Sequence, residues 1–262
     1  MRILEELFGG QVVKHIIERM LIKNGASMVG FAKLEGLYDK MDSDEESGED
    51  SIREPFEIPQ YPMGISIALA YPRAVIKGIN QVPTMEYHDA YHELNNQLDD
   101  LANMCAEYLE EQGYNAYPQT ISSIKEFGVF RTVMPHKTVA VHAGLGWIGK
   151  SALFVTEQYG SALRLTSVLT DAPLKHKGAI LQSRCGECML CMNACPGKAI
   201  SGREWNPQLD RDEFFNAMDC RKKAREISAT ILNKEITLCG KCIEVCPYTQ
   251  RYIKGTEISN KG

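Results

Sequence analysis

The chain has 262 residues, 44% of them hydrophobic, and a formal net charge of −5. This apolar content is enough for one large domain, or for one domain with a small appendage, without disulfide bonds. This net negative charge argues against a broad surface that binds nucleic acid. The local basic run Arg221, Lys222, Lys223 and Arg225 is, on a helix, more often a solvated face. No apolar run is long enough to span a bilayer, and the first residues show no signal-peptide pattern. We therefore expect a cytoplasmic protein with no membrane partner.

The first half of the chain alternates helix and strand patterns. Apolar residues at helical spacing predict a helix over residues 4–23, and the stretch SMVGFAKL predicts a strand over residues 27–34. Residues 39–50 hold seven acidic side chains and predict a solvated loop. An apolar run at residues 61–72 predicts a buried central strand, and residues 86–112 carry the longest helical pattern.

Two histidines of this long predicted helix have a possible functional role, and one cysteine has a structural role. His88 and His92 are one turn apart, as in some metal sites, but no third ligand is evident. Contact with a substrate or cofactor is the stronger alternative for this pair. Cys105 lies in an apolar helical pattern and is expected to be a buried thiol.

A glycine-rich loop follows at residues 144–151, GLGWIGKS. It matches two nucleotide-binding patterns, but both require a strand before the loop and a helix after it. Here a predicted helix, PHKTVAVHA, comes first and the strand-like ALFVT follows, which argues against nucleotide binding. We expect the glycines to allow the backbone to approach a flat cofactor or another chain segment, with Trp147 stacking against it. A tight turn with a core tryptophan is the alternative. The cofactor-binding candidates are Gly144, Gly146, Trp147, Ile148, Gly149 and Lys150.

The composition changes after residue 178. The run YGSALRLTSVLTDAPL predicts a strand that ends at Thr170 and completes an α/β pattern, whereas the later residues are rich in cysteine and short loops. We therefore expect two domains, an α/β cofactor or substrate core at residues 1–178 and a cysteine module at residues 179–262.

The cysteine module opens with CGECMLCMNACP, residues 185–196. Its Cys-x2-Cys-x2-Cys-x3-Cys-Pro spacing is that of a ferredoxin-type iron-sulfur loop, in which the fourth cysteine serves a second cluster. The pattern returns at Cys239, Cys242 and Cys246, but Ile236 occupies the place of a first cysteine. Cys220 is the available substitute, and a helix over WNPQLDRDEFFNAMDC, residues 205–220, is expected to deliver it.

Crosswise pairing of the two loops gives two [4Fe-4S] clusters and uses eight of the nine cysteines. Zinc sites and disulfides are weaker alternatives. Structural zinc favours well-separated cysteine pairs, and disulfides favour small secreted domains. The two predicted ligand sets are Cys185, Cys188, Cys191 and Cys246, and Cys195, Cys220, Cys239 and Cys242.

Four segments in this order resemble a known family: HKTVAVHAGLGWIGKSALFV, YGSALRLTSVLTDAPL, CGECMLCMNACPGKAI and GKCIEVCPYTQ. Together with SMVGFAKL and SIALAYP, they are similar to the epoxyqueuosine reductase family over most of residues 15–250. That family is cobalamin-dependent, contains iron-sulfur clusters and is related to the reductive dehalogenases. The resemblance implies a nitroreductase-like α/β core that holds base-off cobalamin, followed by a ferredoxin-like module with two [4Fe-4S] clusters that supplies electrons.

The chain departs from the family in its substrate-related features. The family's reductase has a catalytic aspartate shortly before the glycine loop, and this chain has Phe130 there. The helical-repeat tail of some members is also missing. Together with the acidic net charge, these differences lead us to expect a smaller substrate than transfer RNA.

Two functional hypotheses follow. The first is an iron-sulfur oxidoreductase that passes electrons through two clusters to a cofactor, with cobalamin as a candidate, or to a substrate at the Gly144–Lys150 loop. Its electron donor would be a protein such as ferredoxin or flavodoxin, and Lys150 and Arg131 are candidates to hold an anionic group. The second is an electron carrier or reductive activator that serves a partner protein. For the first, the candidate proton donors are His142, His136, Tyr91 and His92.

Overall fold

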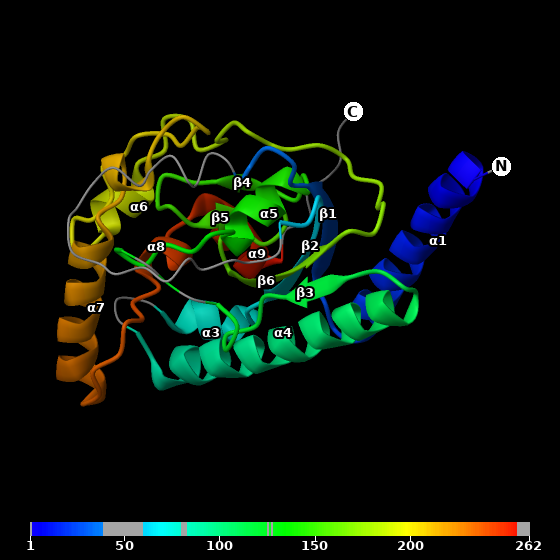
Figure 1. Ribbon diagram of the computed structural model, residues 1–262. Coiled ribbons are helices and arrows are strands. Elements are labelled where there is room, and N and C mark those ends of the chain that lie inside the picture. The colour runs from blue at the N-terminus through cyan, green and yellow to red at the C-terminus, as the bar shows by residue number, and fades with distance from the viewer. Residues whose placement is uncertain (1, 39–59, 80–82, 125, 127, 256–262) are drawn as a thin grey trace. The chain divides into compact units, whose positions relative to one another are not determined.

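The computed structural model describes residues 2–38, 60–79, 83–124, 126 and 128–255 (Figure 1). The chain divides into two compact units. The first comprises residues 1–67, 99–144 and 166–179, and the second comprises residues 68–98, 145–165 and 180–262. The predicted domain boundary after residue 178 stays a prediction, and the predicted acidic loop at residues 39–50 lies outside the described residues.

A four-stranded sheet is built on the two long apolar strands. The strand order is β1-β2-β6-β3, and β3 runs antiparallel to β6, with Ala116 opposite Thr170. The two inner strands, β2 and β6, are long and mostly buried, which explains their nearly continuous apolar sequences. The strand bounds are β1 Met28–Lys33, β2 Met63–Ala70, β3 Ala116–Pro118 and β6 Leu163–Thr170.

Helices of the first unit follow the predicted apolar patterns. Helix α1 (Arg2–Lys23) packs on β1 and buries Ile17 and Leu21 completely. Helix α5 (His136–His142) also packs on β1. Each helix therefore covers the apolar sheet with its own apolar stripe.

The long helix α4 (Met85–Glu111) confirms the longest helical pattern of the sequence. Residues 85–98 belong to the second unit and residues 99–111 to the first. Cys105 is fully buried, and this burial raises the pKa of its thiol to about 12. The predicted role of Cys105 as a small buried hydrophobe is confirmed.

The second unit combines a hairpin with short helices. Strands β4 (Trp147–Ile148) and β5 (Phe154–Val155) pair antiparallel. The remaining elements are α3 Arg73–Gly78, α6 Leu190–Ala194, the 3-10 helix η1 Arg211–Glu213, α7 Ala217–Leu232, α8 Lys241–Glu244 and α9 Pro247–Lys254.

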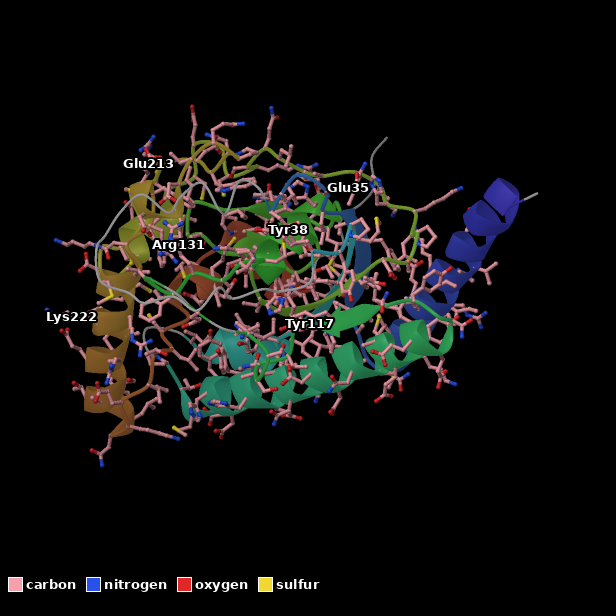
Figure 2. All side chains as sticks on the ribbon, in the orientation of Figure 1. Glu35, Tyr38, Tyr117, Arg131, Glu213 and Lys222 are labelled. Carbon is pink, nitrogen blue, oxygen red and sulfur yellow. The ribbon has the colours of Figure 1, made fainter. Side chains whose placement is uncertain are left out.

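The helix predicted over residues 205–220 is wrong in extent, although α7 does carry Cys220. Asp210 and Glu213 form a capping box around η1 alone. Helix α7 then starts at Ala217, because the side chain of Asn216 accepts the backbone N–H of Asp219. Cys220 therefore lies in the first turn of α7. Lys222, two residues further along the helix, projects outward from it (Figure 2).

Within the described part of the chain, no helix is both long and apolar enough to cross a bilayer. The longest described helix, α4, carries charged side chains along its length.

Candidate metal centre

Short helices of the second unit position the eight cysteines of the two predicted ligand sets. Cys191 lies in α6, and Cys195 directly follows this helix. Cys242 lies in α8, and Cys246 is the N-cap residue of α9. The prolines after Cys195 and Cys246 fix the backbone where the chain leaves each loop.

The first set of thiols gathers around Cys191. Burial raises the pKa of the Cys191 thiol to about 11, and the neighbouring thiols of Cys185, Cys246 and Cys188 raise it further. The thiol of Cys246 also has a raised pKa, again mainly through burial, and Cys185 is one of its electrostatic neighbours.

The second set gathers around Cys220 and Cys242. Burial raises the pKa of Cys220 to about 11, with added repulsion from Cys195 and Cys239. Burial also raises the pKa of Cys242 well above its usual value, with added repulsion from the other three members of the set and from Cys191 of the first set. The structure thus brings together the members of each predicted set. That each set holds one cluster stays a prediction.

Hydrogen-bond donors surround several of these sulfur atoms. The backbone N–H of Ala199 donates to Cys195 Sγ at 3.3 Å. Burial raises the pKa of Cys246, and the nearby backbone N–H groups of Thr249 and Tyr248 partly offset this rise. Such donors stabilise a thiolate and a metal-bound sulfur, so the buried sulfur atoms fit an iron-sulfur site.

The thiols of each set are not placed for a single ion. Among the described residues, no three His, Cys, Asp or Glu side chains lie close enough together to hold one metal ion. His88 and His92 are among these described residues, and they form no such group. Their rings lie 4.6 Å apart, edge to face.

The glycine loop leads from helix α5 into the β4–β5 hairpin, as the order of the sequence patterns predicts. The hairpin turn is closed by Gly149, whose N–H donates to the Leu153 carbonyl and whose carbonyl accepts the N–H of Ala152. Lys150 therefore lies in a hairpin turn and not at the N-terminus of a helix. A phosphate-binding loop needs the helix, so this loop does not have that geometry.

Three glycines of the loop make room for other parts of the chain. A Cβ atom on Gly146 would lie 2.2 Å from the Val155 carbonyl oxygen. One on Gly149 would lie 2.9 Å from the Val155 side chain and 3.4 Å from Cys185 Sγ. Gly144, in the first unit, adopts a positive φ of 70° and faces the carbonyl of Gly178. Of the two approaches that the sequence left open, the structure shows the approach to a chain segment.

Lys150 and Trp147 are buried beside the first cysteine loop. Only 3% of Lys150 is exposed, and its Nζ donates to the Gly186 carbonyl at 2.6 Å. Trp147 is 1% exposed and meets Tyr248 edge to face at 4.9 Å. Trp147 is thus a core side chain here, and the hairpin lies against the loop of Cys185.

The candidate proton donors are divided between the two units. Tyr91 and His92 belong to the second unit, where the Arg164 guanidinium lies over the Tyr91 ring at 4.2 Å. His136 and His142 belong to the first unit, on α5. The Nδ1 atom of His136 lies 2.8 Å from Ser167 Oγ, which itself accepts a hydrogen bond from Gln119.

The sequence patterns did not single out Arg164 or Thr249. Arg164 donates to the buried Asn95 side chain at 2.9 Å, which holds it over Tyr91. A charged residue inside a predicted apolar strand is unusual, and this could have marked Arg164 as a candidate. Phe130, at the place of the family's aspartate, has a positive φ of 54°, which no sequence pattern indicates.

Comparison with known proteins supports the cysteine module directly. A family model described as a 4Fe-4S double cluster binding domain matches residues 184–249. The matched range lies inside the predicted module at residues 179–262 and contains all eight predicted ligands.

Curated relatives are epoxyqueuosine reductases. The protein of Listeria monocytogenes is 32% identical over 114 residues, which cover 43% of this chain and 29% of the relative. That of Lactococcus garvieae is 28% identical over 204 residues, covering 71% of this chain and 51% of the relative. The chain thus spans about half or less of the length of these relatives.

Solved structures show the same fold. A catabolic reductive dehalogenase bound to 3-bromo-4-hydroxybenzoic acid has a TM-score of 0.63 and 17% identity, covering 86% of this chain and 30% of its own. A reductive dehalogenase described in terms of B12-dependent dehalogenation has a TM-score of 0.62 and 16% identity, covering 85% and 30%. An epoxyqueuosine reductase with a modified tRNA-Tyr stem loop has a TM-score of 0.57 and 20% identity, covering 91% and 65%.

Fold and thiol arrangement together define an iron-sulfur protein of mixed α/β fold with a C-terminal double-cluster domain. Within that class, its sequence and fold are similar to those of the epoxyqueuosine reductases, and the resemblance of the sequence motifs is confirmed.

Proposed function

We propose that the chain is an iron-sulfur oxidoreductase similar to the epoxyqueuosine reductases. One observation carries the proposal: eight of the nine cysteines gather into two sets within the segment that matches a double 4Fe-4S domain. Bound clusters would supply single-electron transfer. The protein residues supply the thiolates, the hydrogen bonds to sulfur and the exclusion of water.

The ligand assignment follows the two thiol sets. Cys185, Cys188, Cys191 and Cys246 would hold the first cluster, and Cys195, Cys220, Cys239 and Cys242 the second. The electrostatic neighbours of Cys191 and of Cys220 support this assignment.

Electrons would pass from the clusters toward the Gly144–Lys150 loop. Gly149 lies next to Cys185 Sγ, and the Lys150 ammonium bonds the neighbouring Gly186 carbonyl. Through these contacts, the hairpin end of the loop lies beside the first thiol set.

Cobalamin is the candidate acceptor, since one fold neighbour is described in terms of B12-dependent chemistry. The close contacts of Gly146 and Gly149 are filled by the hairpin and the cysteine loop, so these glycines give no argument for a flat cofactor. Tyr91, His92, His136 and His142 remain the candidate proton donors.

For the substrate, we propose a molecule smaller than transfer RNA, and for the electron donor a carrier protein such as ferredoxin or flavodoxin. Phe130 supports the difference in substrate, because its phenyl side chain has no ionisable proton to transfer, whereas a carboxylic acid does.

Anaerobic reconstitution with iron, sulfide and hydroxocobalamin, followed by desalting and metal analysis, tests the proposal. We expect about eight irons per chain, and one cobalt if the acceptor is a corrinoid. About eight irons without cobalt would reject the corrinoid and favour an electron carrier that serves a partner protein. About four irons or fewer would contradict the double-cluster assignment itself.

A further inference from the structure

Lys150 is a buried lysine whose side chain reaches into the first cysteine loop. Only 3% of the residue is exposed. Its Nζ donates to the Gly186 carbonyl at 2.6 Å and lies 3.7 Å from Met189 Sδ. Gly186 directly follows Cys185 in the chain, and Met189 directly follows Cys188. The ammonium group therefore lies beside the segment that supplies two predicted ligands of the first cluster.

The hairpin turn that carries Lys150 is fixed against the same loop. Gly149, the preceding residue, comes so close that a Cβ atom on it would lie 3.4 Å from Cys185 Sγ. The N–H of Gly149 donates to the Leu153 carbonyl at 2.9 Å, and this hydrogen bond closes the turn. The backbone of the turn and the tip of the lysine side chain thus both contact the first cysteine loop.

The positive charge of Lys150 forms no ion pair with a carboxylate in the described part of the chain. The exposed side chain of Glu204 is near, but it accepts the backbone N–H of Gly186 at 2.6 Å and does not pair with the ammonium. A carbonyl oxygen and a thioether replace only part of the solvation that a buried ammonium loses. The ammonium therefore favours a negatively charged group beside this loop.

We propose that Lys150 is a positioning residue whose buried ammonium balances the negative charge of the first cluster and raises its reduction potential. This inference rests on the proposed two-cluster function. A [4Fe-4S] cluster with four thiolate ligands becomes more negative on reduction, and its net charge helps to set its potential. A fixed positive charge nearby stabilises the reduced form more than the oxidised form. Because Lys150 contacts the loop of the first set, its charge should affect the first cluster more than the second.

The test is a redox titration of the reconstituted protein followed by electron paramagnetic resonance. Lys150→Met replaces the ammonium with an unbranched apolar side chain, and we expect full iron content and a lower potential for one cluster. At a fixed solution potential, the ratio of reduced to oxidised form of that cluster should fall about tenfold, which corresponds to about 59 mV for one electron. The other cluster should shift less. Lys150→Arg keeps the positive charge and should keep a potential close to that of the wild-type protein.

Two further variants separate the buried charge from other effects. Lys150→Gln keeps a hydrogen-bond donor of shorter reach but is neutral, so it should lower the potential as Lys150→Met does. Lys223→Met is the matched control, because it removes the same charge from an exposed position. Lys223 lies on α7, three residues after Cys220, and pairs with Glu226 at 3.0 Å. Water and salt screen an exposed charge, so the ratio for either cluster should change less than about twofold.

An unchanged potential in a fully loaded Lys150→Met protein would overturn the inference. An equal fall in Lys150→Arg, or equal shifts of both clusters, would also overturn it. Iron analysis of the wild-type protein comes first, because about four irons or fewer there would count against the proposed function and not against Lys150.

Iron content replaces the potential as the measured quantity if the neutral variants do not load both clusters. About four irons in Lys150→Met and Lys150→Gln, with about eight in Lys150→Arg, would support a requirement for positive charge beside the first cluster. An equal loss of iron in all three variants would overturn the inference, because it would show a need for the lysine side chain itself and not for its charge.

Discussion

Buried cysteines of the second unit disfavour the deprotonated thiolate form when no metal is bound. Burial raises the pKa of Cys191 and of Cys220 to about 11, so both carry a proton at neutral pH when no metal is bound. Iron must displace these protons, and its positive charge replaces the lost solvation. The ligands of one cluster should therefore gain or lose their metal together.

This cooperation gives a test of which residues share a cluster. We predict that Cys220→Ser and Cys239→Ser, from the same set, each lower the iron content from about eight to about four. The double variant Cys220→Ser/Cys239→Ser should lose no more, whereas Cys220→Ser/Cys246→Ser should lose nearly all. Iron and sulfide analysis after anaerobic reconstitution measures these contents.

Cys105→Ala serves as the control for this series, because Cys105 is buried in α4 and belongs to neither set. It should keep about eight irons. Four remaining irons in Cys220→Ser/Cys246→Ser, or none in Cys220→Ser/Cys239→Ser, would contradict the crosswise assignment.

At the scale of elements, long periodic segments were predictable and short ones were not. Helix α4 and strand β2 follow directly from apolar patterns that extend over many residues. Strands β4 and β5 have two residues each, too few for an alternating pattern to appear. The start of α7 depends on the side-chain cap of Asn216, which the sequence interpretation overlooked.

In the candidate site too, some features could be predicted from the sequence and others could not. Cysteine spacing identified the two thiol sets, because covalent geometry links ligand spacing to the cluster. The contact of Thr249 with Ser161 joins positions 88 residues apart, and local sequence does not encode such a pairing. The close packing of Gly146 against Val155 is likewise a tertiary contact, so the sequence could not choose between a cofactor and a chain segment.

The β4–β5 hairpin offers a prediction about this packing. We expect Gly146→Ala to destabilise the protein by about 1–3 kcal/mol, because its Cβ would overlap the Val155 carbonyl and the Phe154 ring. Gly78→Ala, at the end of α3, is the matched control, since a Cβ there meets nothing within 4 Å. It should be neutral or stabilising by less than about 1 kcal/mol. Urea unfolding of the reconstituted proteins measures both, and equal midpoints for the two variants would refute the packing argument.

At the scale of the whole molecule, the distribution of charge bears on the substrate. The chain carries a formal net charge of −5, and its basic run lies on α7. Within this run, Lys223 pairs with Glu226 at 3.0 Å and Arg225 pairs with Glu235. Nucleic-acid binding depends strongly on unpaired basic groups that neutralise phosphates.

We therefore predict that the reconstituted chain does not bind an epoxyqueuosine-modified tRNA-Tyr stem loop specifically at physiological salt. Fluorescence anisotropy with a labelled stem loop measures this, and the affinity should be no tighter than that for an unmodified stem loop of the same length. Any binding at low salt should weaken in Lys222→Glu, because the exposed Lys222 of α7 is a basic group available to phosphate. Glu107→Gln, on the exposed side of α4, removes a charge elsewhere and should not weaken it. Tight, modification-dependent binding at physiological salt, accompanied by reduction of the epoxide when electrons are supplied, would show that transfer RNA is the substrate despite the acidic charge and Phe130.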